Sequence, residues 1–275
     1  FIQALVWLIL VRPAGIVSFG GYLAVPVVIC GWILGIPAVT HEQTVVTGWA
    51  NKVIALFARQ VAVTWPSSLA HFPPGKAVFV GLPLRPELVK LKSKLPGKVY
   101  EPITVYITGG KQGAHVLNKL VFDQVSRLVL KYRLIHQTGS STVYHDWDKA
   151  GLISVPGYAA FDFDSAKAID ALRRADVVVS RAGAHAVYEL GFLGKKCVLV
   201  PIPWVSHHEQ DQNAQVLAEA GLAVILPEAK LNYTTLVAAI DRAKRLTGSP
   251  MNLPGQAGNA MVDLVETVMR GYERN

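Results

Sequence analysis

Three loops of this sequence carry glycines or polar side chains in patterns that suit the binding of a ligand, and two of them suit an anion. The first, SRAGAHAVYE, follows a β-branched apolar run and opens a segment with helical spacing. The amides of Gly183, Ala184 and His185 would lie in a first helical turn, where free N–H groups and the helix dipole favour phosphate. Glu189 follows one and a half turns later, and its two carboxylate oxygens suit a ribose diol. The alternative for Glu189 is a solvated helix residue.

The second loop, ITGGKQGAHVLN, places Gly109, Gly110 and Gly113 between a strand-like and a helix-like segment. Glycine allows the backbone to approach a phosphate closely. The pattern is neither G-x-G-x-x-G nor a P-loop, and close packing of strand against helix is an alternative explanation. In the third loop, PWVSHHEQDQNA, Gln210 and Asn213 lie one turn apart at a helix start. Amides can fix sugar hydroxyls, and ordinary capping of the helix is the alternative.

Alternating strand and helix patterns must position these loops. We expect strands at 15–19, 36–43, 77–81, 103–108, 133–137, 152–155, 176–179, 197–201 and 223–226. We expect helices at 23–35, 114–131, 166–174, 184–193, 210–220, 233–246 and near 258–271, with 84–102 as an interdomain linker. Repeated βα units indicate a doubly wound parallel sheet, whose ligands bind beyond the carboxyl ends of the strands.

Charge is distributed unevenly along the 275 residues, whose net charge is +8. Residues 1–98 carry nine Lys/Arg and two Asp/Glu, giving +7, whereas the remainder is nearly neutral. This favours contact of the first part with an anionic membrane surface or ligand. Nucleic acid is disfavoured, because no Lys/Arg run alternates with aromatic residues. Cys30 and Cys197 are expected to be buried free thiols, and no His spacing indicates a metal site.

Two apolar segments of the first part bear on membrane contact. Ala14–Thr40 has 27 residues without a charge. Its glycines and prolines favour a buried βαβ unit, with a transmembrane helix as the alternative. Residues 1–11 suit a helix that dips into a membrane interface or packs on further residues.

The motifs GGKQGAHVLN, ADVVVSRAGAHAVYE, HEQDQNA, SFGGY, GIPAVTHEQ…NK and GLPLR occur in the order found in the MurG family. The sequence resembles that family over nearly its whole length. Its members transfer N-acetylglucosamine from UDP-N-acetylglucosamine to undecaprenyl-pyrophosphoryl-N-acetylmuramoyl-pentapeptide. The resemblance implies an α/β fold of GT-B type, with two Rossmann-like domains facing a cleft. Residues 1–95 would form an acceptor and membrane-side domain lacking its N-terminal part. Residues 96–275 would bind the UDP-sugar, with the last helix a candidate to return to the first domain.

The resemblance also assigns roles to individual residues. It implies that Glu189 binds the ribose hydroxyls and that Gln210 binds the N-acetylglucosamine hydroxyls. It places the turn of Gly183, Ala184, His185 and Ala186 near the diphosphate and sugar. Arg85 is implied at the donor site, the backbone around Phe163–Ser165 near uracil, and Tyr22, His41, Thr44 and Asn51 at acceptor-side and cleft positions.

Several positions depart from the family pattern. Lys111 stands where the family has Ser, Thr44 where it has Asn, and Ala186 where a hydroxyl residue is common. We expect Lys111 to replace a hydroxyl contact to the diphosphate, with a solvated lysine as the alternative. The family's first glycine-rich loop, with its histidine, is expected to precede Phe1. His41 is therefore the base candidate in this sequence, with a structural histidine as the alternative.

The implied reaction is a single inverting displacement that needs no cofactor or metal. The DFD at 162–164 has the spacing of an Asp-x-Asp metal motif, and we interpret it as coincidence. The expected location is the cytoplasmic face of the bacterial inner membrane, as a peripheral protein. The alternatives are another glycolipid-forming UDP-sugar glycosyltransferase, or a non-catalytic fragment that binds UDP-sugar. A UDP-N-acetylglucosamine 2-epimerase is disfavoured by the apolar first segment.

Overall fold

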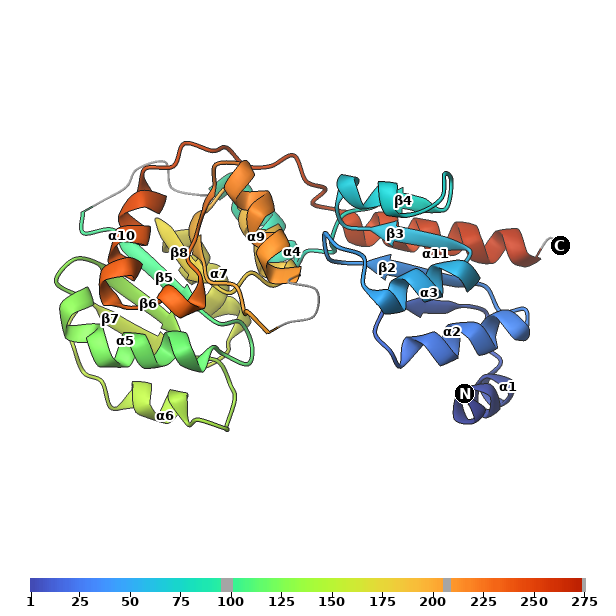
Figure 1. Ribbon diagram of the computed structural model, residues 1–275, viewed down its shortest axis with the longest axis horizontal. Coiled ribbons are helices and arrows are strands. Elements are labelled where there is room, and N and C mark those ends of the chain that lie inside the picture. The colour runs from blue at the N-terminus through green and yellow to red at the C-terminus, as the bar shows by residue number, and fades with distance from the viewer. Residues whose placement is uncertain (95–100, 205–208, 274–275) are drawn as a thin grey trace. The chain divides into compact units, whose positions relative to one another are not determined.

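The structure, a computed structural model, describes residues 1–94, 101–204 and 209–273. It divides into two compact units (Figure 1). Unit 1 comprises Phe1–Leu84 and Leu253–Asn275, and unit 2 comprises Arg85–Asn252. Residues 85–94, assigned to the first domain from sequence, belong to unit 2, and the last helix belongs to unit 1. The functional assignment of the two predicted domains stays a prediction.

Unit 1 is built on a four-stranded parallel sheet in the order β1-β2-β3-β4. Its strands are β1 (Ile16–Ser18), β2 (Ala38–Glu42), β3 (Gln60–Val63) and β4 (Ala77–Phe79). Its α-helices are α1 (Ile2–Val11), α2 (Ala24–Ile33), α3 (Trp49–Phe57) and α11 (Ala257–Glu273), and η1 (Pro66–His71) is a 3₁₀ turn.

Strand β2 is buried on both faces because alternate side chains point to opposite sides of the sheet. Ala38 packs with Ile16, Val28 and Ile54 on the side of α1, α2 and α3. Its neighbour Val39 packs instead against α11. The predicted βαβ unit is therefore confirmed. Among the described residues, no helix combines the length and apolar character needed to cross a bilayer.

Unit 2 is built on a six-stranded parallel sheet in the order β10-β9-β8-β5-β6-β7. The strands are β5 (Thr104–Thr108), β6 (Arg133–Gln137), β7 (Tyr158–Phe161), β8 (Val177–Ser180), β9 (Lys196–Leu199) and β10 (Ala223–Ile225). Read from the β7 edge, the order is 3-2-1-4-5-6. The chain's winding reverses between β5 and β8, so the loops after these strands diverge and leave a crevice.

The helices of unit 2 lie on both faces of this sheet. They are α4 (Pro86–Leu91), α5 (His115–Leu128), α6 (Asp146–Gly151), α7 (Ser165–Arg174), α8 (Ala184–Leu193), α9 (Glu209–Glu219) and α10 (Tyr233–Lys244). Two 3₁₀ turns, η2 (Lys92–Lys94) and η4 (Glu228–Lys230), are also present. Helices α5 and α10 share one core with alternate residues of the strands, such as Val105, Val177 and Val198. The opposite face of β5 and β8, with Tyr106 and Val178, faces the cavity described below.

Most predicted elements are confirmed to within a few residues, and two were wrong. No strand forms at 152–155. There, Ile153 and Val155 pack against the core from a loop, and the strand follows at β7. The segment 84–102 is not a bare linker, because α4 buries Leu88 and Leu91 and contacts α7. Residues 95–100 of that segment lie outside the described part. Helices α3 and α6 and strand β3 were not predicted. Cys30 and Cys197 are buried free thiols, as expected.

Candidate functional site

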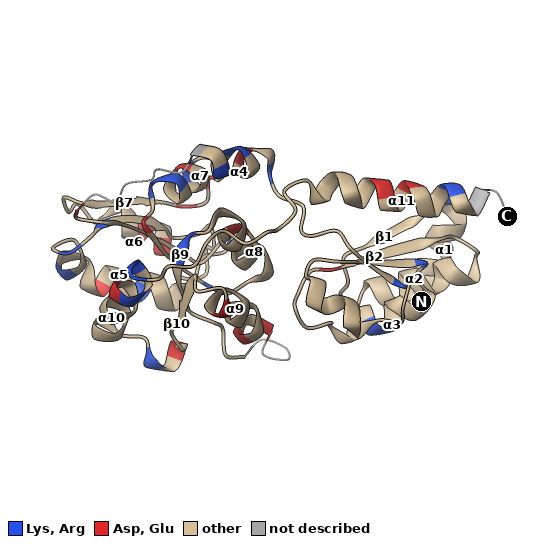
Figure 2. Cartoon of the chain, turned by 90° about the horizontal axis from the view of Figure 1, so that it is seen from above, with Lys and Arg blue, Asp and Glu red and all other residues tan. Residues whose placement is uncertain are grey.

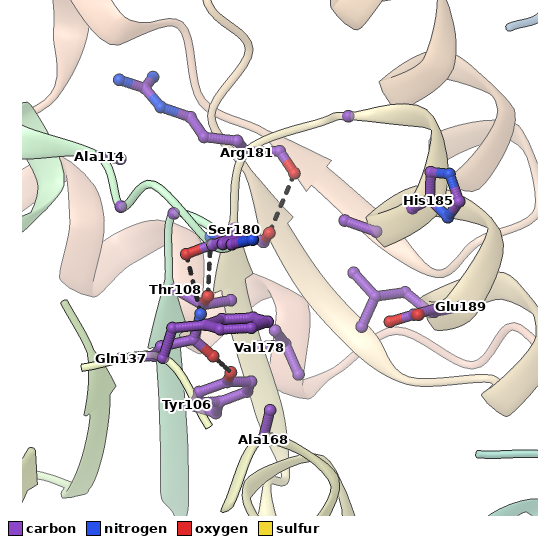
Figure 3. Close-up of a pocket in the computed structure, with 18 of the residues that line it drawn as sticks. Tyr106, Thr108, Ala114, Gln137, Ala168, Val178, Ser180, Arg181, His185 and Glu189 are labelled. Atoms are coloured by element: carbon purple, nitrogen blue, oxygen red, sulfur yellow. Dashed lines mark hydrogen bonds between the residues drawn. The ribbon is translucent and has the colours of Figure 1, made fainter. Parts of the chain in front are cut away.

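A cavity of about 810 Å³ lies in unit 2 at the carboxyl ends of β5 and β8. This is where the reversal of strand order predicts a ligand. Its lining comes from the loops after β5, β7 and β8, from α7 and α8, and from the start of α9. Figure 3 shows Glu189 and His185 on α8, with Thr108, Gln137 and Tyr106 on the other side of the cavity. The cavity contains most of the residues predicted from the second part of the sequence.

Two helices begin at this cavity without a side chain that caps them. The N-cap of α5 is Ala114 and that of α8 is Gly183, and neither makes a side-chain cap hydrogen bond. In contrast, α7 is capped by Asp164, whose carboxylate accepts a hydrogen bond from the amide of Lys167 at 2.8 Å. The first amides of α5 and α8 therefore remain able to bind an anion, which the positive end of each helix dipole also favours.

The glycines that line the cavity differ in whether neighbouring atoms leave room for a side chain. A Cβ at Gly109 would lie 2.2 Å from the amide nitrogen of Ala114, and one at Gly113 would lie 2.0 Å from the Thr138 carbonyl oxygen. Packing therefore requires both, as the alternative explanation proposed. Gly183 differs, because a Cβ there would meet no atom within 4 Å and its φ of −66° suits any residue. The space beside Gly183 is open cavity.

Glu189 lies in the cavity opposite a cation. Its Oε1 atom is 3.7 Å from Nη2 of Arg85, and the two side chains are 20% and 37% exposed. Burial raises the pKa of Glu189, and the charge of Arg85 partly offsets this rise. Burial lowers the pKa of His185, and Arg85 lowers it further. The carboxylate is thus partly desolvated, so donors from a ligand would stabilise its charged form.

A polar network holds the glycine loop after β5. The hydroxyl of Tyr106 donates to Oε1 of Gln137 at 2.6 Å, and Nε2 of Gln137 donates to the Gly110 carbonyl at 2.8 Å. The Gly110 amide donates to Oγ1 of Thr108 at 3.0 Å. These bonds fix the backbone that carries Lys111. The ammonium of Lys111 lies 5.9 Å from the ring centroid of Phe163, and Lys111, Phe163 and Ser165 all line the cavity.

The amide side chains at the start of α9 connect neighbouring loops. The Oε1 atom of Gln210 accepts from the amide of Ile202 at 3.1 Å, and Nδ2 of Asn213 donates to the Ala182 carbonyl at 3.2 Å. Gln210 lines the cavity, together with Ala184 and Ala186. Residues 205–208 of the third predicted motif lie outside the described part of the chain.

Several lining residues were not predicted from sequence, among them Arg181, His115 and Tyr144. Arg181 is buried, pairs with Glu228 and donates from Nη1 to the Val200 carbonyl at 3.1 Å. His115 and Tyr144 line the cavity beside the start of α5. His115 belongs to the GGKQGAH motif, but its hydrogen-bonding partner Asp146 lies about thirty residues further along the chain, and no local pattern links the two.

The site residues predicted in unit 1 are Tyr22, His41, Thr44 and Asn51. Thr44 and Asn51 both donate to the buried carboxylate of Glu42, at 2.9 and 3.0 Å. Tyr22 is exposed on the surface. His41 is fully buried, with Nε2 3.0 Å from both the Gly81 carbonyl oxygen and Oγ1 of Thr64. This burial favours the structural alternative for His41, and its role as base stays a prediction that its position does not support.

One of the two carboxylates of the DFD motif at 162–164 has a structural role, because Asp164 is the N-cap of α7. Across the described ranges, no three His, Cys, Asp or Glu side chains are grouped to hold a metal ion.

Comparison with known proteins identifies relatives over most of the chain. The Glycosyltransferase family 28 C-terminal domain matches residues 104–267, and the Glycosyltransferase family 28 N-terminal domain matches residues 1–63. A UDP-N-acetylglucosamine--N-acetylmuramyl-(pentapeptide) pyrophosphoryl-undecaprenol N-acetylglucosamine transferase of Clostridium novyi is 32% identical over 272 residues. That match covers 96% of this chain and 74% of the relative. The transferase of the same name from Desulfotalea psychrophila is 36% identical over 247 residues, covering 87% of this chain and 65% of the relative.

Solved structures agree on the fold. The crystal structure of MurG from Acinetobacter baumannii is 25% identical, with a TM-score of 0.68, over 97% of this chain and 77% of that one. A UDP-GlcNAc 2-epimerase from Neisseria meningitidis, solved with UDP-GlcNAc, has a TM-score of 0.66 at 11% identity, over 96% and 79% of the two chains. The second likeness shows the fold alone. The chain spans about two thirds to three quarters of the length of the curated relatives described here.

Proposed function

Because the chain belongs to glycosyltransferase family 28, and within it to the MurG family, we propose that it is a UDP-N-acetylglucosamine-dependent hexosyltransferase. Its reaction is transfer of N-acetylglucosamine to undecaprenyl-linked N-acetylmuramoyl-pentapeptide in peptidoglycan synthesis. The observation that carries this proposal is the cavity of unit 2, where two uncapped helix starts lie beside Glu189.

Each part of UDP-N-acetylglucosamine has a suitable group in this cavity. The amides of Gly183, Ala184 and His185 would bind the diphosphate, and the carboxylate of Glu189 would accept hydrogen bonds from the ribose diol. The Nε2 amide group of Gln210 would contact the sugar, since the Oε1 atom accepts a hydrogen bond from Ile202. The start of α7 near Ser165 would face the uracil.

The reaction would be one inverting displacement. The acceptor hydroxyl attacks the anomeric carbon, a base takes its proton, and UDP leaves with the electrons of the broken C–O bond. Fixed amides at the helix starts would stabilise the charge that develops on the leaving diphosphate. Lys111, at the cavity entrance, would add a cation. We assign no residue to the base, because His41 is buried.

Unit 1 would bind the lipid acceptor at a membrane surface. Helix α1 leaves Ile2, Val6, Trp7, Leu10 and Val11 exposed. Neither α1 nor α2 carries a charged residue within its bounds (Figure 2). Apolar side chains beside basic residues such as Arg12 suit an anionic lipid surface. We therefore place the protein peripherally on the cytoplasmic face of the inner membrane, with no nucleic-acid partner.

Two alternatives share the donor site. Thr44, Lys111 and Ala186 depart from the family pattern, so another glycolipid acceptor or sugar is an alternative within the same class. A protein that binds UDP-sugar without turnover is the other alternative.

The deciding experiment follows radiolabelled sugar from UDP-N-acetylglucosamine into an undecaprenyl-linked acceptor. The 275-residue chain should produce labelled lipid. UDP binding without product would support the non-catalytic alternative, and absence of both binding and product would contradict the proposal.

A further inference from the structure

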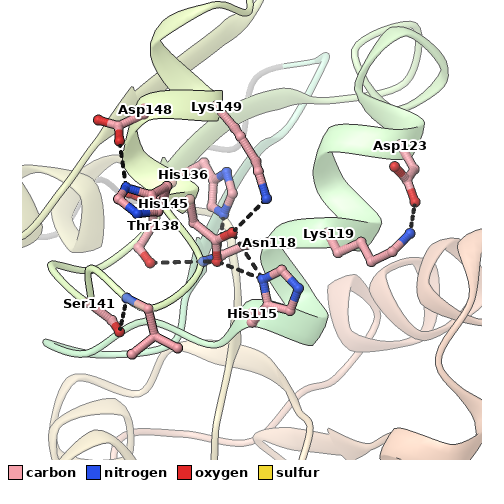
Figure 4. A network of polar contacts seen from close by, with 12 residues as sticks. His115, Asn118, Lys119, Asp123, His136, Thr138, Ser141, His145, Asp148 and Lys149 are labelled. Atoms are coloured by element: carbon pink, nitrogen blue, oxygen red, sulfur yellow. Dashed lines mark hydrogen bonds and ion pairs between the residues drawn. The ribbon is translucent and has the colours of Figure 1, made fainter.

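A buried carboxylate fixes a histidine at the edge of the cavity in unit 2. Nδ1 of His115 lies 3.0 and 3.1 Å from the two carboxylate oxygens of Asp146. Figure 4 shows His115 in the polar network that also contains Asn118, His136 and Lys149. His115 is the first residue of α5, and its ring lines the cavity. The ring of Tyr144 stacks on it, with centroids 3.8 Å apart and an angle of 11° between the planes. The imidazole therefore has one orientation.

Asp146 has two further partners, Asn118 and Lys149. Its Oδ2 atom accepts from Nδ2 of Asn118 at 2.8 Å, and Oδ1 lies 3.9 Å from the ammonium of Lys149. The same Asn118 amide group also donates to the Thr138 carbonyl at 2.9 Å. Asp146 is thus satisfied on both oxygens while it holds the ring of His115.

A second histidine, His136, belongs to the same network, and its hydrogen bonds indicate which atoms carry protons. Burial lowers the pKa of His136 to about 3, so this ring is neutral. Asn118 uses its nitrogen as a donor, so its Oδ1 accepts from Nε2 of His136 at 3.0 Å. Nδ1 of His136 then accepts from the Tyr158 hydroxyl at 2.9 Å. His115, Asn118, His136 and Asp146 form this network, and nearly all of their side-chain nitrogen and oxygen atoms have a hydrogen-bond partner. The exception is Nε2 of His115, which has none among the described residues.

The chemistry of that remaining nitrogen follows from its partner. A carboxylate only accepts hydrogen bonds, so Nδ1 of His115 carries a proton. When the ring is doubly protonated, Nε2 is a charged donor in the same helical turn as the uncapped start of α5. The loop that leads to this turn carries Lys111. Donors of this kind pair best with an anionic oxygen.

We propose that His115 binds a phosphate oxygen of the nucleotide diphosphate through Nε2, and that Asp146 acts as its positioning residue. This assignment rests on the proposed function, because it takes a UDP-sugar as the ligand. His115 would hold the diphosphate from the β5 side of the crevice, while the start of α8 holds it from the β8 side. The diphosphate would then bridge the two loops that diverge between β5 and β8.

Two substitutions of His115 test the contributions of its two ring nitrogens separately. The amide nitrogen of Asn lies near the position of Nδ1, so His115→Asn keeps a donor to Asp146 and loses Nε2. The amide nitrogen of Gln reaches the position of Nε2, so His115→Gln keeps the donor toward the ligand. Both variants lose the stacking on Tyr144 equally. His145→Asn is the matched control, because His145 is exposed, does not line the cavity and has a φ of 51° that Asn tolerates.

The measurement is the dissociation constant for UDP and for uridine by calorimetry and competition, on the whole chain, with melting temperature recorded for each variant. His115→Asn should weaken UDP binding about tenfold or more, the scale of a hydrogen bond to a charged group, and leave uridine binding unchanged. His115→Gln should recover part of the UDP affinity, and His145→Asn should match the parent.

Several results would overturn the assignment. Unchanged UDP affinity in His115→Asn would do so, as would an equal loss in the Asn and Gln variants. Equal loss of uridine binding would show that the ring contacts the nucleoside instead of the phosphate. If Glu189→Ala weakens UDP binding and His115→Asn does not, this inference fails and the proposed function stands. If the parent chain does not bind UDP at all, the proposed function itself fails.

Discussion

Arg85 and Glu189 approach to 3.7 Å at the cavity, although 104 positions separate them in the sequence. Arg85 is the N-cap of α4, and Glu189 lies on α8. Both side chains keep some exposure, so the pair contributes little to stability by itself. The pair places a cation beside a partly desolvated carboxylate, and both side chains line the cavity.

The open space at Gly183 should be needed for ligand and not for folding. Gly183→Val introduces a side chain at a position with no atom near the new Cβ and with an ordinary φ. We expect a melting temperature within a few degrees of the parent and a loss of UDP affinity of tenfold or more, because the side chain would occupy the diphosphate position. Thermal unfolding and calorimetry check this together. A valine variant that binds UDP normally would place the diphosphate elsewhere.

The raised pKa of Glu189 should appear in the pH dependence of UDP binding. Ribose hydroxyls donate to the ionised carboxylate, so binding stabilises the charged form and lowers this pKa. Affinity should therefore be highest above the raised pKa and fall as pH decreases through it, beginning above the ordinary glutamate range near pH 4.3. The UDP phosphate also titrates near pH 6. Glu189→Gln, measured in parallel, should show only the phosphate dependence, and identical profiles for the two proteins would refute the ribose contact.

Lys111 should act on the leaving group rather than on folding. It is exposed, and its ammonium lies over Phe163 at the cavity entrance. Lys111→Ala should lower kcat more than it raises KM, with a loss of roughly 2–4 kcal/mol, the scale of one electrostatic transition-state donor. Lys111→Ser should regain part of this loss if a hydroxyl can replace the cation. Parent-like kinetics in both variants would show a solvated lysine.

Membrane contact should depend on the exposed face of α1. Trp7 and Leu10 are 66% and 71% exposed, so the double substitution Trp7→Ser and Leu10→Ser should leave folding intact. It should reduce co-sedimentation with anionic vesicles. Binding of the parent should rise with anionic lipid and decrease with salt. Leu152→Ser is the control, because Leu152 is 86% exposed in unit 2. Equal binding of all three proteins, or equal binding of the parent to neutral vesicles, would contradict this orientation.

The order of elements could be predicted from sequence where the pattern is regular. Strand β6 and helix α8 have the predicted bounds, and glycines mark where they end: Gly139 lies just beyond β6, and Gly183 and Gly194 flank α8. The run at 152–155 is mostly apolar, yet it forms a loop whose Ile153 and Val155 pack on the core. Burial by a loop and burial by a strand leave the same apolar signal in sequence.

The site was predictable where its residues lie within one loop. Gly183 and Glu189 fall on a single strand–helix junction, and both line the cavity. The sequence could not separate glycines that packing requires, such as Gly109, from Gly183, which it does not. The role proposed for His115 depends on Asp146, the first residue of α6, which the fold brings beside it. Pairing over such distances along the chain has no local signature.

We propose that the cavity of unit 2 binds a uridine diphosphate sugar through Glu189, and UDP titration calorimetry of Glu189→Ala is the decisive measurement. Glu219→Ala serves as the control, because Glu219 is an exposed glutamate of α9 away from the cavity. Loss of hydrogen bonds to a charged group should weaken UDP binding by roughly 1.5–3 kcal/mol in Glu189→Ala, and the control should bind like the parent. Equal UDP affinity in the parent and Glu189→Ala would show that Glu189 does not bind the nucleotide.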